Sequence, residues 1–577
     1  MEKIMESTYS PGKGSTVKRH LRHQTALLLT SILLSFMIVD AQEISYPKMQ
    51  VPLNIDLALS GNFGELRSGH FHGGVDFKTW NETGKPIMAP ADGYISRVSV
   101  SNGGYGNGLY ITHTNGYTTV YGHLEAFMPK VAARIRDYQY AHQTYVTDLE
   151  FGPDEFPVRE GEVVALSGNT GYSFGPHLHF EVRKTDTDEP IDPLLFYKTR
   201  LKDDVPPRAS SIMLYVQKGW GVLNGSDEKV FLEVKGNNVE ATELTGWGKV
   251  GAAIAAYDYM TGTTNYYGVQ SVKLFVDNEL VSESKVGRFD FDENRMLDSW
   301  IDYEERVKTG KWYMRSTIAP RNPLRMLKAY NNDYGWVTID EARIYRFRYE
   351  IRDIYGNLSV YRFNVKGVRQ DIPTTLANYF YFMKAGEPHS LTWKDLSLWI
   401  PKDGLYEDLQ LNFEERDGTY QFCAVPTPLL ENVELRLQVA QPMTADKSKY
   451  YIAEEWDGNH IYRGGTYEYG WLKTSVSRLG TYVIMVDTVP PRIKPYQETS
   501  WTKDGKVSFK LSDAESGVKD YRGTIDGEWK LFRFSSKDML LWCDLQEEHI
   551  PHGHHTAEIT ITDLRQNVNK QTFEFDY

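Results

Sequence analysis

Seven of the fifteen histidines in this 577-residue sequence lie between positions 70 and 179, and three short segments give five of them a specific context. These segments are His70-Phe71-His72-Gly73-Gly74-Val75-Asp76, Tyr121-Gly122-His123-Leu124 and Gly175-Pro176-His177-Leu178-His179-Phe180-Glu181. Zinc takes histidine nitrogen and carboxylate oxygen as ligands, and catalytic zinc sites keep three protein ligands and one open position. Two histidines and one aspartate fit that number, which leaves further histidines for acid–base chemistry.

The third segment alternates polar and apolar residues as a half-buried strand does. Its polar face carries His177, His179 and Glu181, and its apolar face carries Leu178, Phe180 and Val182. We expect the apolar face to enter a core, so that the two imidazoles project together from the other side. In the first segment, Gly73 and Gly74 permit a tight turn that can bring Asp76 back towards His72.

The elements that must position these residues read as short strands. From Gln42 onward the sequence shows short alternating runs separated by Gly, Asn and Pro, which is typical of an all-β chain with antiparallel sheets. Residues 109–113 and 117–124 flank Asn115-Gly116, and this pattern predicts a hairpin. A helix is expected only over 128–138, inside an insertion between His123 and Gly161.

The three segments resemble the lysostaphin-type or LytM-like zinc metallopeptidases, which cleave peptide cross-links of bacterial peptidoglycan. The resemblance covers roughly residues 60–185, and the motifs occur in the order of the family. It implies that His72, Asp76 and His179 bind one Zn²⁺ ion per chain. It also implies that His123 and His177 flank the metal-bound water and the scissile carbonyl. The insertion after His123 departs from the family, which leaves the shape of the cleft open.

Several roles stay open at this point. Either His123 or His177 could deprotonate the water, stabilise the oxyanion or return a proton to the leaving amine. Glu181 or His70 could accept or donate a hydrogen bond at the far nitrogen of a ligating imidazole. His72 is favoured over His70 as the ligand, because only His72 is separated from Asp76 by three residues, as in the H-x-x-x-D motif of the family. His113 is expected to be a packed strand residue.

The second half of the chain contains two copies of one β pattern. Residues 206–207, 268–269, 276–279 and 353–357 are echoed by residues 490–491, 517–518, 525–528 and 563–567. The step from Val269 to Asp277 equals that from Val518 to Asp526. We therefore expect immunoglobulin-like β-sandwich modules after the peptidase domain. The predicted domains are a signal peptide (1–41), a LytM-like zinc peptidase domain (42–200), an immunoglobulin-like module with an insertion (201–370), a β-rich middle module (371–488) and a C-terminal immunoglobulin-like module (489–577). The pairs Asp353/Asn357 and Asp563/Asn567 could bind calcium, but turns explain them more simply.

The N-terminal segment and the composition limit the possible compartment and partners of the protein. Residues 26–39 are apolar and follow Lys18, Arg19 and Arg22, which predicts a secretory signal cleaved after Ala41; an uncleaved anchor is the alternative. After cleavage no stable membrane span is expected. The formal charge of −13 disfavours nucleic acid as a partner. The two cysteines, Cys423 and Cys543, exclude a Cys-rich zinc site, and their pairing stays open.

The sequence therefore predicts an exported zinc metalloendopeptidase, periplasmic or at the cell surface of a bacterium, whose partner is the peptide stem of peptidoglycan. Two alternatives remain: a non-catalytic LytM-like protein that binds or activates at the cell wall, and an adhesive surface protein with a vestigial peptidase domain. Protein partners and the oligomeric state stay open.

Overall fold

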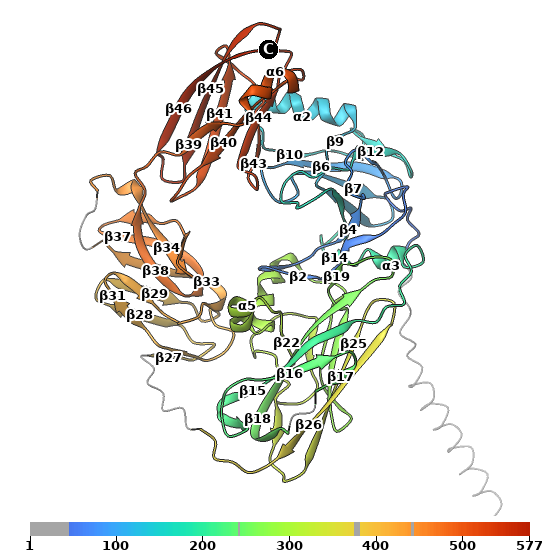
Figure 1. Cartoon of the computed structure of the whole chain (residues 1–577), viewed down its shortest axis with the longest axis vertical. Helices are drawn as coiled ribbons and strands as arrows, with labels where there is room; N and C mark the ends of the chain where they lie inside the picture. The colour runs from blue at the N-terminus through green and yellow to red at the C-terminus, as the bar shows by residue number, and fades with distance from the viewer. Residues whose placement is uncertain (1–45, 241–242, 374–380, 440–443) are drawn as a thin grey trace, which may run out of the picture. The chain divides into compact units, whose positions relative to one another are not determined.

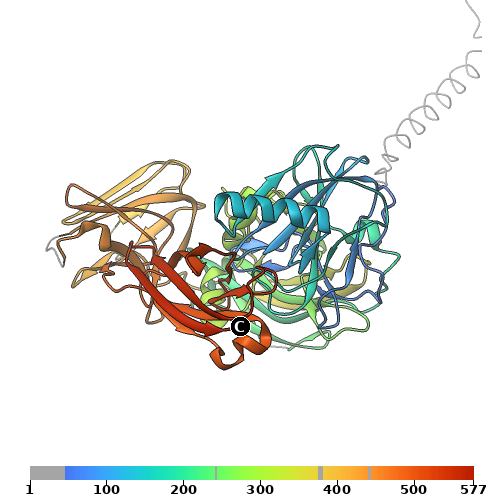
Figure 2. The same ribbon diagram turned by 90° about the horizontal axis from the view of Figure 1, so that it is seen from above.

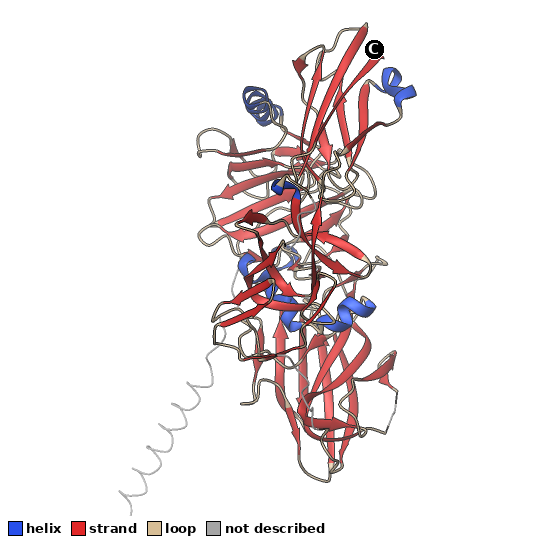
Figure 3. Ribbon diagram, turned by 90° about the vertical axis from the view of Figure 1, so that its left-hand side faces the viewer, coloured by secondary structure: helices blue, strands red, loops and turns tan. Residues whose placement is uncertain are grey.

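The computed structural model describes residues 46–240, 243–373, 381–439 and 444–577. The predicted signal peptide lies outside these residues. Within them, no helix is both long enough and apolar enough to span a membrane. Strands dominate and the helices are few, as Figure 3 shows, so the predicted all-β fold is confirmed. Residues 49–577 form one unit by their contacts.

The histidine-rich segments lie in one antiparallel sheet. Its main path runs β1-β4-β13-β8-β7-β6-β10. The strands are β1 (Leu59–Gly61), β4 (Val75–Lys78), β13 (His177–Lys184), β8 (Tyr117–Gly122), β7 (Asn107–His113), β6 (Gly93–Val100) and β10 (Thr147–Glu150). A second, three-stranded sheet contains β5 (Pro86–Met88), β12 (Val163–Leu166) and β9 (Ala126–Phe127).

Strand β13 alternates polar and apolar side chains as the sequence predicts, but it is buried on both faces from Leu178 to Arg183 and is not half-buried. Leu178, Phe180 and Val182 are fully buried and belong to one core with Phe77 and Tyr121. Burial of side chains of this size stabilises the sheet by about 1.5–3 kcal/mol each. The opposite face of β13 is therefore fixed as the face that carries the histidines.

The predicted hairpin and helix are both present. Strands β7 and β8 pair antiparallel, and Gly116 between them has φ 87°, a left-handed conformation that glycine adopts without strain. Helix α2 (Pro129–His142) extends four residues beyond the predicted end and is drawn in cyan in Figures 1 and 2. The insertion that contains α2 also adds β10 and β11 (Pro157–Val158) to β6.

The next sheet spans residues 208–367 and packs against the start of the peptidase segment. Its strands are β15 (Arg208–Leu223), β16 (Val230–Lys235), β17 (Asn238–Val239), β18 (Thr245–Tyr259), β19 (Tyr266–Tyr267), β20 (Ser271–Val276), β21 (Glu279–Lys285), β22 (Met314–Arg315), β23 (Leu327–Ala329), β24 (Val337–Ile339), β25 (Ile344–Arg352) and β26 (Leu358–Gly367). The short helices η1 (Phe291–Met296), α4 (Leu297–Trp300) and α5 (Tyr303–Thr309) follow β21. The Phe289 ring stacks on Phe63 at 5.1 Å, and Phe71 N donates to Asn294 Oδ1 at 3.1 Å. These contacts hold the chain immediately before His72.

The remaining residues form pairs of facing sheets with separate cores. Residues 389–486 contain the sheets β28-β29-β33-β37-β36 and β31-β32-β38-β34-β35, with β27 pairing β30 beside them, and residues 492–576 contain β39-β40-β44-β43 and β42-β41-β45-β46. Their bounds are β27 (Tyr381–Met383), β28 (His389–Trp393), β29 (Leu396–Ile400), β30 (Leu409–Leu411), β31 (Glu414–Arg416), β32 (Thr419–Gln421), β33 (Thr427–Gln438), η2 (Lys447–Lys449), β34 (Tyr450–Trp456), β35 (Asn459–Tyr462), β36 (Thr466–Glu468), β37 (Trp471–Leu479), β38 (Thr481–Val486), β39 (Arg492–Pro495), η3 (Glu498–Ser500), α6 (Trp501–Asp504), β40 (Lys506–Ser512), β41 (Val518–Ile525), β42 (Glu528–Trp529), β43 (Arg533–Ser535), β44 (Leu540–Asp544), β45 (His554–Asp563) and β46 (Val568–Asp576). Both cysteines are free thiols.

The repeat seen in the sequence has a structural counterpart. Asp277 and Asn278, with φ 50° and 71°, join β20 to β21. Asp526 and Gly527, with φ 52° and 82°, join β41 to β42. Two successive left-handed residues are the signature of a type I′ hairpin turn, so both copies use the same turn.

Candidate metal centre and its flanking histidines

Three neighbouring strands bring the candidate residues together. Asp76 in β4 lies opposite His179 in β13, and Gly122 at the end of β8 lies opposite the same residue on its other side. His123 follows Gly122 directly and leaves the strand with φ 62°. The pairing register of β4, β13 and β8 therefore assembles residues that are about a hundred positions apart.

His72 reaches this point through a glycine turn between β3 (His70–Phe71) and β4. A Cβ atom on Gly74 would lie 2.2 Å from the carbonyl oxygen of Phe180, which leaves no room for a side chain. Only glycine lets the chain cross β13 so closely. The turn thereby places the His72 imidazole beside Asp76.

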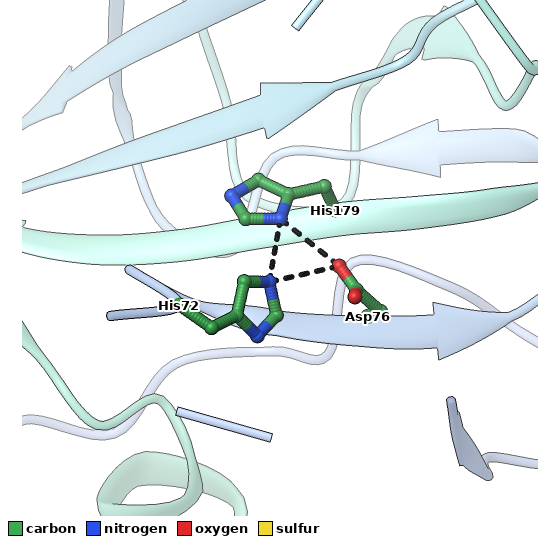
Figure 4. Close-up of side chains that lie close together, drawn as sticks. All are labelled: His72, Asp76 and His179. Atoms are coloured by element: carbon green, nitrogen blue, oxygen red, sulfur yellow. Dashed lines mark hydrogen bonds and ion pairs between the residues drawn. The ribbon is translucent and has the colours of Figure 1, made fainter. Parts of the chain in front are cut away.

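Figure 4 shows the three side chains converging. His72 Nε2 lies 3.0 Å from His179 Nδ1 and 3.1 Å from Asp76 Oδ1, and His179 Nδ1 lies 2.9 Å from the same oxygen. All three residues are buried, with 2%, 5% and 5% of their surfaces exposed for His72, Asp76 and His179. These residues form a group that could hold a metal ion.

The outer hydrogen bonds of the imidazoles decide which nitrogens face inward without a proton. His72 Nδ1 donates to the carbonyl oxygen of Asn62 at 2.7 Å, and His179 Nε2 donates to Glu181 Oε1 at 2.8 Å. A neutral imidazole has a single N–H, so each inward nitrogen presents a lone pair in the neutral form of the ring, which is the form that binds a metal. Two such lone pairs and a carboxylate oxygen at about 3 Å from one another could hold a metal ion, and this donor set suits zinc.

The pKa values of these groups agree with a site that favours positive charge. Burial lowers the pKa of His72 to about 4. Burial also lowers the pKa of His179, but its hydrogen bonds to Asp76 and Glu181 outweigh burial and raise the pKa to about 9. Burial raises the pKa of Asp76, yet the charge of His72 and the hydrogen bonds from the histidines hold it well below its usual value. A proton or a metal ion can supply the charge, and the two compete.

Glu181 is itself held by residues that the sequence analysis did not identify. Arg183 Nε donates to Glu181 Oε2 at 2.7 Å, and the Tyr105 hydroxyl donates to Glu181 Oε1. Burial raises the pKa of Glu181, but the Arg183 charge and the hydrogen bonds lower it to about 2. Arg183 continues the alternation of β13, so extending that pattern by two residues would have found it.

Arg67 contacts the outer oxygen of the candidate aspartate ligand. Arg67 Nη2 donates to Asp76 Oδ2 at 2.7 Å from β2 (Leu66–Arg67), which leaves Oδ1 facing the histidines. Arg67 also lies 3.6 Å from Glu65 Oε1. No spacing in the sequence marks Arg67, because it reaches Asp76 from a separate short strand.

His123 and His177 lie side by side next to this group. Their ring centroids are 4.7 Å apart, and His177 Nε2 is 3.5 Å from Asp76 Oδ1. His123 Nδ1 donates to the carbonyl oxygen of Thr170 at 2.9 Å, and His177 Nδ1 donates to that of Gly175 at 2.8 Å. Burial and the neighbouring His179 and His177 lower the pKa of His123 to about 3. His123 is therefore neutral, with a bare Nε2 available to accept a proton.

The other histidines of this region lie outside the group. His70 is exposed and its Nδ1 contacts the carbonyl oxygen of Ser68 at 3.1 Å, so Glu181, not His70, contacts a candidate ligand. His113 is a packed strand residue, as expected, with Nε2 2.8 Å from Thr119 Oγ1. His142 is exposed at the end of α2.

Comparison with known proteins gives two domain matches. Residues 70–140 and 138–193 match the model described as Peptidase family M23, and residues 380–487 match that of a Zu5-like domain. An uncharacterized metalloprotease of Haemophilus influenzae is 40% identical over 110 residues, which cover 19% of this chain and 18% of the relative. The DD-carboxypeptidase/endopeptidase Mpg of Neisseria meningitidis serogroup B is 35% identical over 129 residues, covering 22% of this chain and 23% of the relative.

The chain thus spans about a fifth of the length of these curated relatives. The solved catalytic domain of lysostaphin from Staphylococcus simulans is 26% identical, with 25% of this chain and 92% of that chain covered and a TM-score of 0.19. The matched residues contain every residue of the group described above. Residues 70–193 of this chain are a domain of peptidase family M23, the lysostaphin type of metallopeptidase.

Proposed function

We propose that this protein is an exported zinc-dependent endopeptidase that hydrolyses peptide cross-links of bacterial peptidoglycan. The observation that carries the proposal is the convergence of three donor atoms, because His72 Nε2, His179 Nδ1 and Asp76 Oδ1 lie within 3.1 Å of one another. In this proposal these three residues hold one Zn²⁺ ion. The periplasm or the cell surface is the proposed compartment.

When bound, zinc supplies Lewis acidity, which lowers the pKa of water and polarises a peptide carbonyl. The chain's own residues supply orientation and proton transfer. His123 has a depressed pKa and a bare Nε2, so it accepts a proton from an attacking water. His177 has the same Nδ1 anchoring and faces Asp76, so its Nε2 orients the polar atoms of the scissile peptide.

Space for a polymeric substrate adjoins this site. A pocket of about 840 Å³ is lined by residues of the peptidase domain, including Glu125, Gly168 and Thr170, and by residues within 496–547 of the C-terminal module. The carbonyl oxygen of Thr170 is the group that anchors His123. An extended peptide in this pocket would pass the loop that fixes the proposed proton acceptor.

The test uses residues 42–577 and isolated peptidoglycan. Bound zinc is measured by mass spectrometry and cleavage by release of soluble fragments, for the wild type, His179→Ala and His123→Ala. We expect His179→Ala to lose zinc and activity, because it removes a donor atom. We expect His123→Ala to keep zinc and to lose activity by about 10²–10⁴-fold, the usual contribution of a proton-transfer group.

The alternatives predict different outcomes. Wild type with one zinc ion but no cleavage of any peptidoglycan preparation would favour a non-catalytic cell-wall protein. Wild type without zinc and without cleavage would favour an adhesive protein with a vestigial peptidase domain. Equal activity of His123→Ala and wild type would contradict the role given to His123.

A further inference from the structure

A second group of acidic side chains lies outside the peptidase site, in the module that follows it. Asp203 lies in the linker between α3 (Leu194–Tyr197) and β15, Asp258 lies in β18, and Asp353 directly follows β25. One oxygen of each carboxylate lies within 4.8 Å of the others. Asp258 and Asp353 are buried, with 5% and 2% of their surfaces exposed. Three separate parts of the module thus direct carboxylates at one point.

Hydrogen bonds satisfy only part of this cluster: Gly356 N and Asn357 Nδ2 donate to Asp353, and Thr261 N donates to Asp203 Oδ1, but two other oxygens have no donor among the described residues. Asp258 Oδ1 and Asp203 Oδ2 are buried and have no hydrogen-bond partner among the residues that the structure describes. Such groups are rare in folded proteins, because an unpaired buried oxygen costs about 1–3 kcal/mol. Burial and the charges of Asp353 and Asp203 raise the pKa of Asp258 to about 8. Each of these observations indicates a missing positive charge at the same place.

The C-terminal module contains a matched cluster that lacks this feature. Asp487, Asp513 and Asp563 lie equally close together. Here Ser516 N donates to Asp487 Oδ2 at 3.2 Å, and Asn567 Nδ2 lies 3.3 Å from Asp487 Oδ1. Protein donors therefore satisfy the linker aspartate of the second copy. The two copies share their aspartates but differ in whether protein groups complete the cluster.

We propose that Asp203, Asp258 and Asp353 bind a calcium ion. Calcium takes six to eight oxygen ligands at flexible geometry, and carboxylates are its usual protein donors. The cluster contains neither nitrogen nor sulfur donors, so it differs in kind from the His72, Asp76 and His179 group. Magnesium demands near-ideal octahedral geometry and keeps several water ligands. Three carboxylates held on separate segments of the chain suit the more flexible coordination of calcium better.

The position of the cluster indicates what the ion does. Asn357 Nδ2 donates to the backbone oxygen of Asp203 at 3.2 Å, which already ties the linker to the end of β25. Two residues beyond Asp258, Met260 packs in the same core as the peptidase sheet. A calcium ion at this point links the linker to the ends of β18 and β25. It therefore stabilises the module where its chain joins that of the peptidase domain.

Calcium titration of residues 42–577 tests the inference. The protein is freed of metal over a chelating resin and given one equivalent of zinc, and CaCl₂ is then titrated by calorimetry with melting temperature as a second readout. We expect one calcium ion per chain and a melting temperature that rises until the site is saturated. Asp258→Asn should weaken calcium binding by at least about tenfold. Without calcium it should melt no lower than wild type, because the amide removes a buried charge.

Two control variants test whether calcium binds at this cluster and not elsewhere. Asp513→Asn alters the satisfied cluster and His179→Ala alters the peptidase site, and both should leave calcium binding unchanged. The inference is overturned if wild type shows no saturable response up to about 10 mM calcium, a concentration well above the dissociation constants of extracellular calcium modules. It is also overturned if Asp258→Asn binds calcium as wild type does, or if magnesium binds and calcium does not.

Discussion

Glu181 Oε1 lies 2.8 Å from His179 Nε2, on the opposite side of the imidazole from Asp76 Oδ1. In the neutral, metal-binding form of His179 this hydrogen bond fixes the tautomer, because it places the single N–H on Nε2 and leaves Nδ1 bare. Arg183 and Tyr105 fix Glu181 in turn. The arrangement is a chain of buried groups behind the inner donor atoms, and it sets how strongly those atoms bind a cation.

Glu181→Gln tests this relationship. The amide can present either its oxygen or its NH₂ group to His179 Nε2, so the bare Nδ1 is no longer enforced, and the negative charge behind the ring is lost. We expect zinc affinity to fall by about 10–100-fold. Competition with a chromogenic chelator measures it. Glu160→Gln changes an exposed glutamate and should leave the affinity unchanged. Equal zinc affinity of Glu181→Gln and wild type would show that the hydrogen bond does not tune the site.

The sequence predicts those site residues that belong to a short local pattern. The alternation in β13 placed His177, His179 and Glu181 on one face, and the glycine turn brought His72 to Asp76. Arg67 and Tyr105 could not be predicted in this way. Both reach the site from hairpins whose packing depends on sheet register, and no repeating pattern along the chain links Arg67 to Asp76 or Tyr105 to Glu181.

The loop that anchors His123 depends on two glycines in close contact. Gly171 has φ 69°, and a Cβ atom there would lie 2.2 Å from Gly106 N. Gly171→Ala should push the neighbouring Thr170 carbonyl away from His123 Nδ1. We expect peptidoglycan cleavage to fall by about tenfold to a hundredfold, since small displacements of a catalytic group have effects of that size. Zinc content should not change.

Gly116→Ala is the control for this prediction. Gly116 also has a left-handed backbone, with φ 87°, but a Cβ atom there meets nothing within 4 Å. Both variants carry about 1–2 kcal/mol of backbone strain, and only Gly171→Ala adds the collision. If Gly116→Ala lost activity to the same extent, strain alone would account for the effect and the anchoring role of the loop would be wrong.

Arg67 compensates the buried carboxylate of Asp76 and the half-buried carboxylate of Glu65, so its removal should destabilise the metal-free protein. In Arg67→Met, Asp76 Oδ2 loses its donor and Glu65 loses its nearest positive charge. We expect the free energy of unfolding to fall by about 1–3 kcal/mol, less than for a fully buried pair because the Arg67 side chain is 34% exposed. Urea unfolding with and without zinc measures it. Zinc should restore part of the lost free energy of unfolding. The double variant Arg67→Met/Glu65→Gln should also be more stable than Arg67→Met alone. A larger loss with zinc than without it would contradict this account.

Asp192 should make stability fall as pH rises. It is buried, accepts a hydrogen bond from Leu194 N at 2.9 Å, and has a pKa raised by burial to about 7. The folded protein therefore holds a proton on Asp192 up to about pH 7, whereas the unfolded chain releases it near pH 4. The folded state binds the extra proton, so its contribution to stability is complete below pH 4 and is lost as pH rises to 7.

Asp192→Asn removes this titration while keeping an oxygen that can accept from Leu194 N. Wild type should lose stability relative to the variant as pH rises from about 5 to about 8.5, and we expect this difference to be about 1–3 kcal/mol. One unit of pKa shift corresponds to about 1.4 kcal/mol, and relaxation around a buried group reduces the effect. Thermal unfolding at the two pH values measures the difference. Asp186→Asn, at an exposed aspartate in the turn after β13, controls for the loss of one negative charge. A stability difference between Asp192→Asn and wild type that does not change with pH would show that Asp192 is ionised in the folded protein throughout this range.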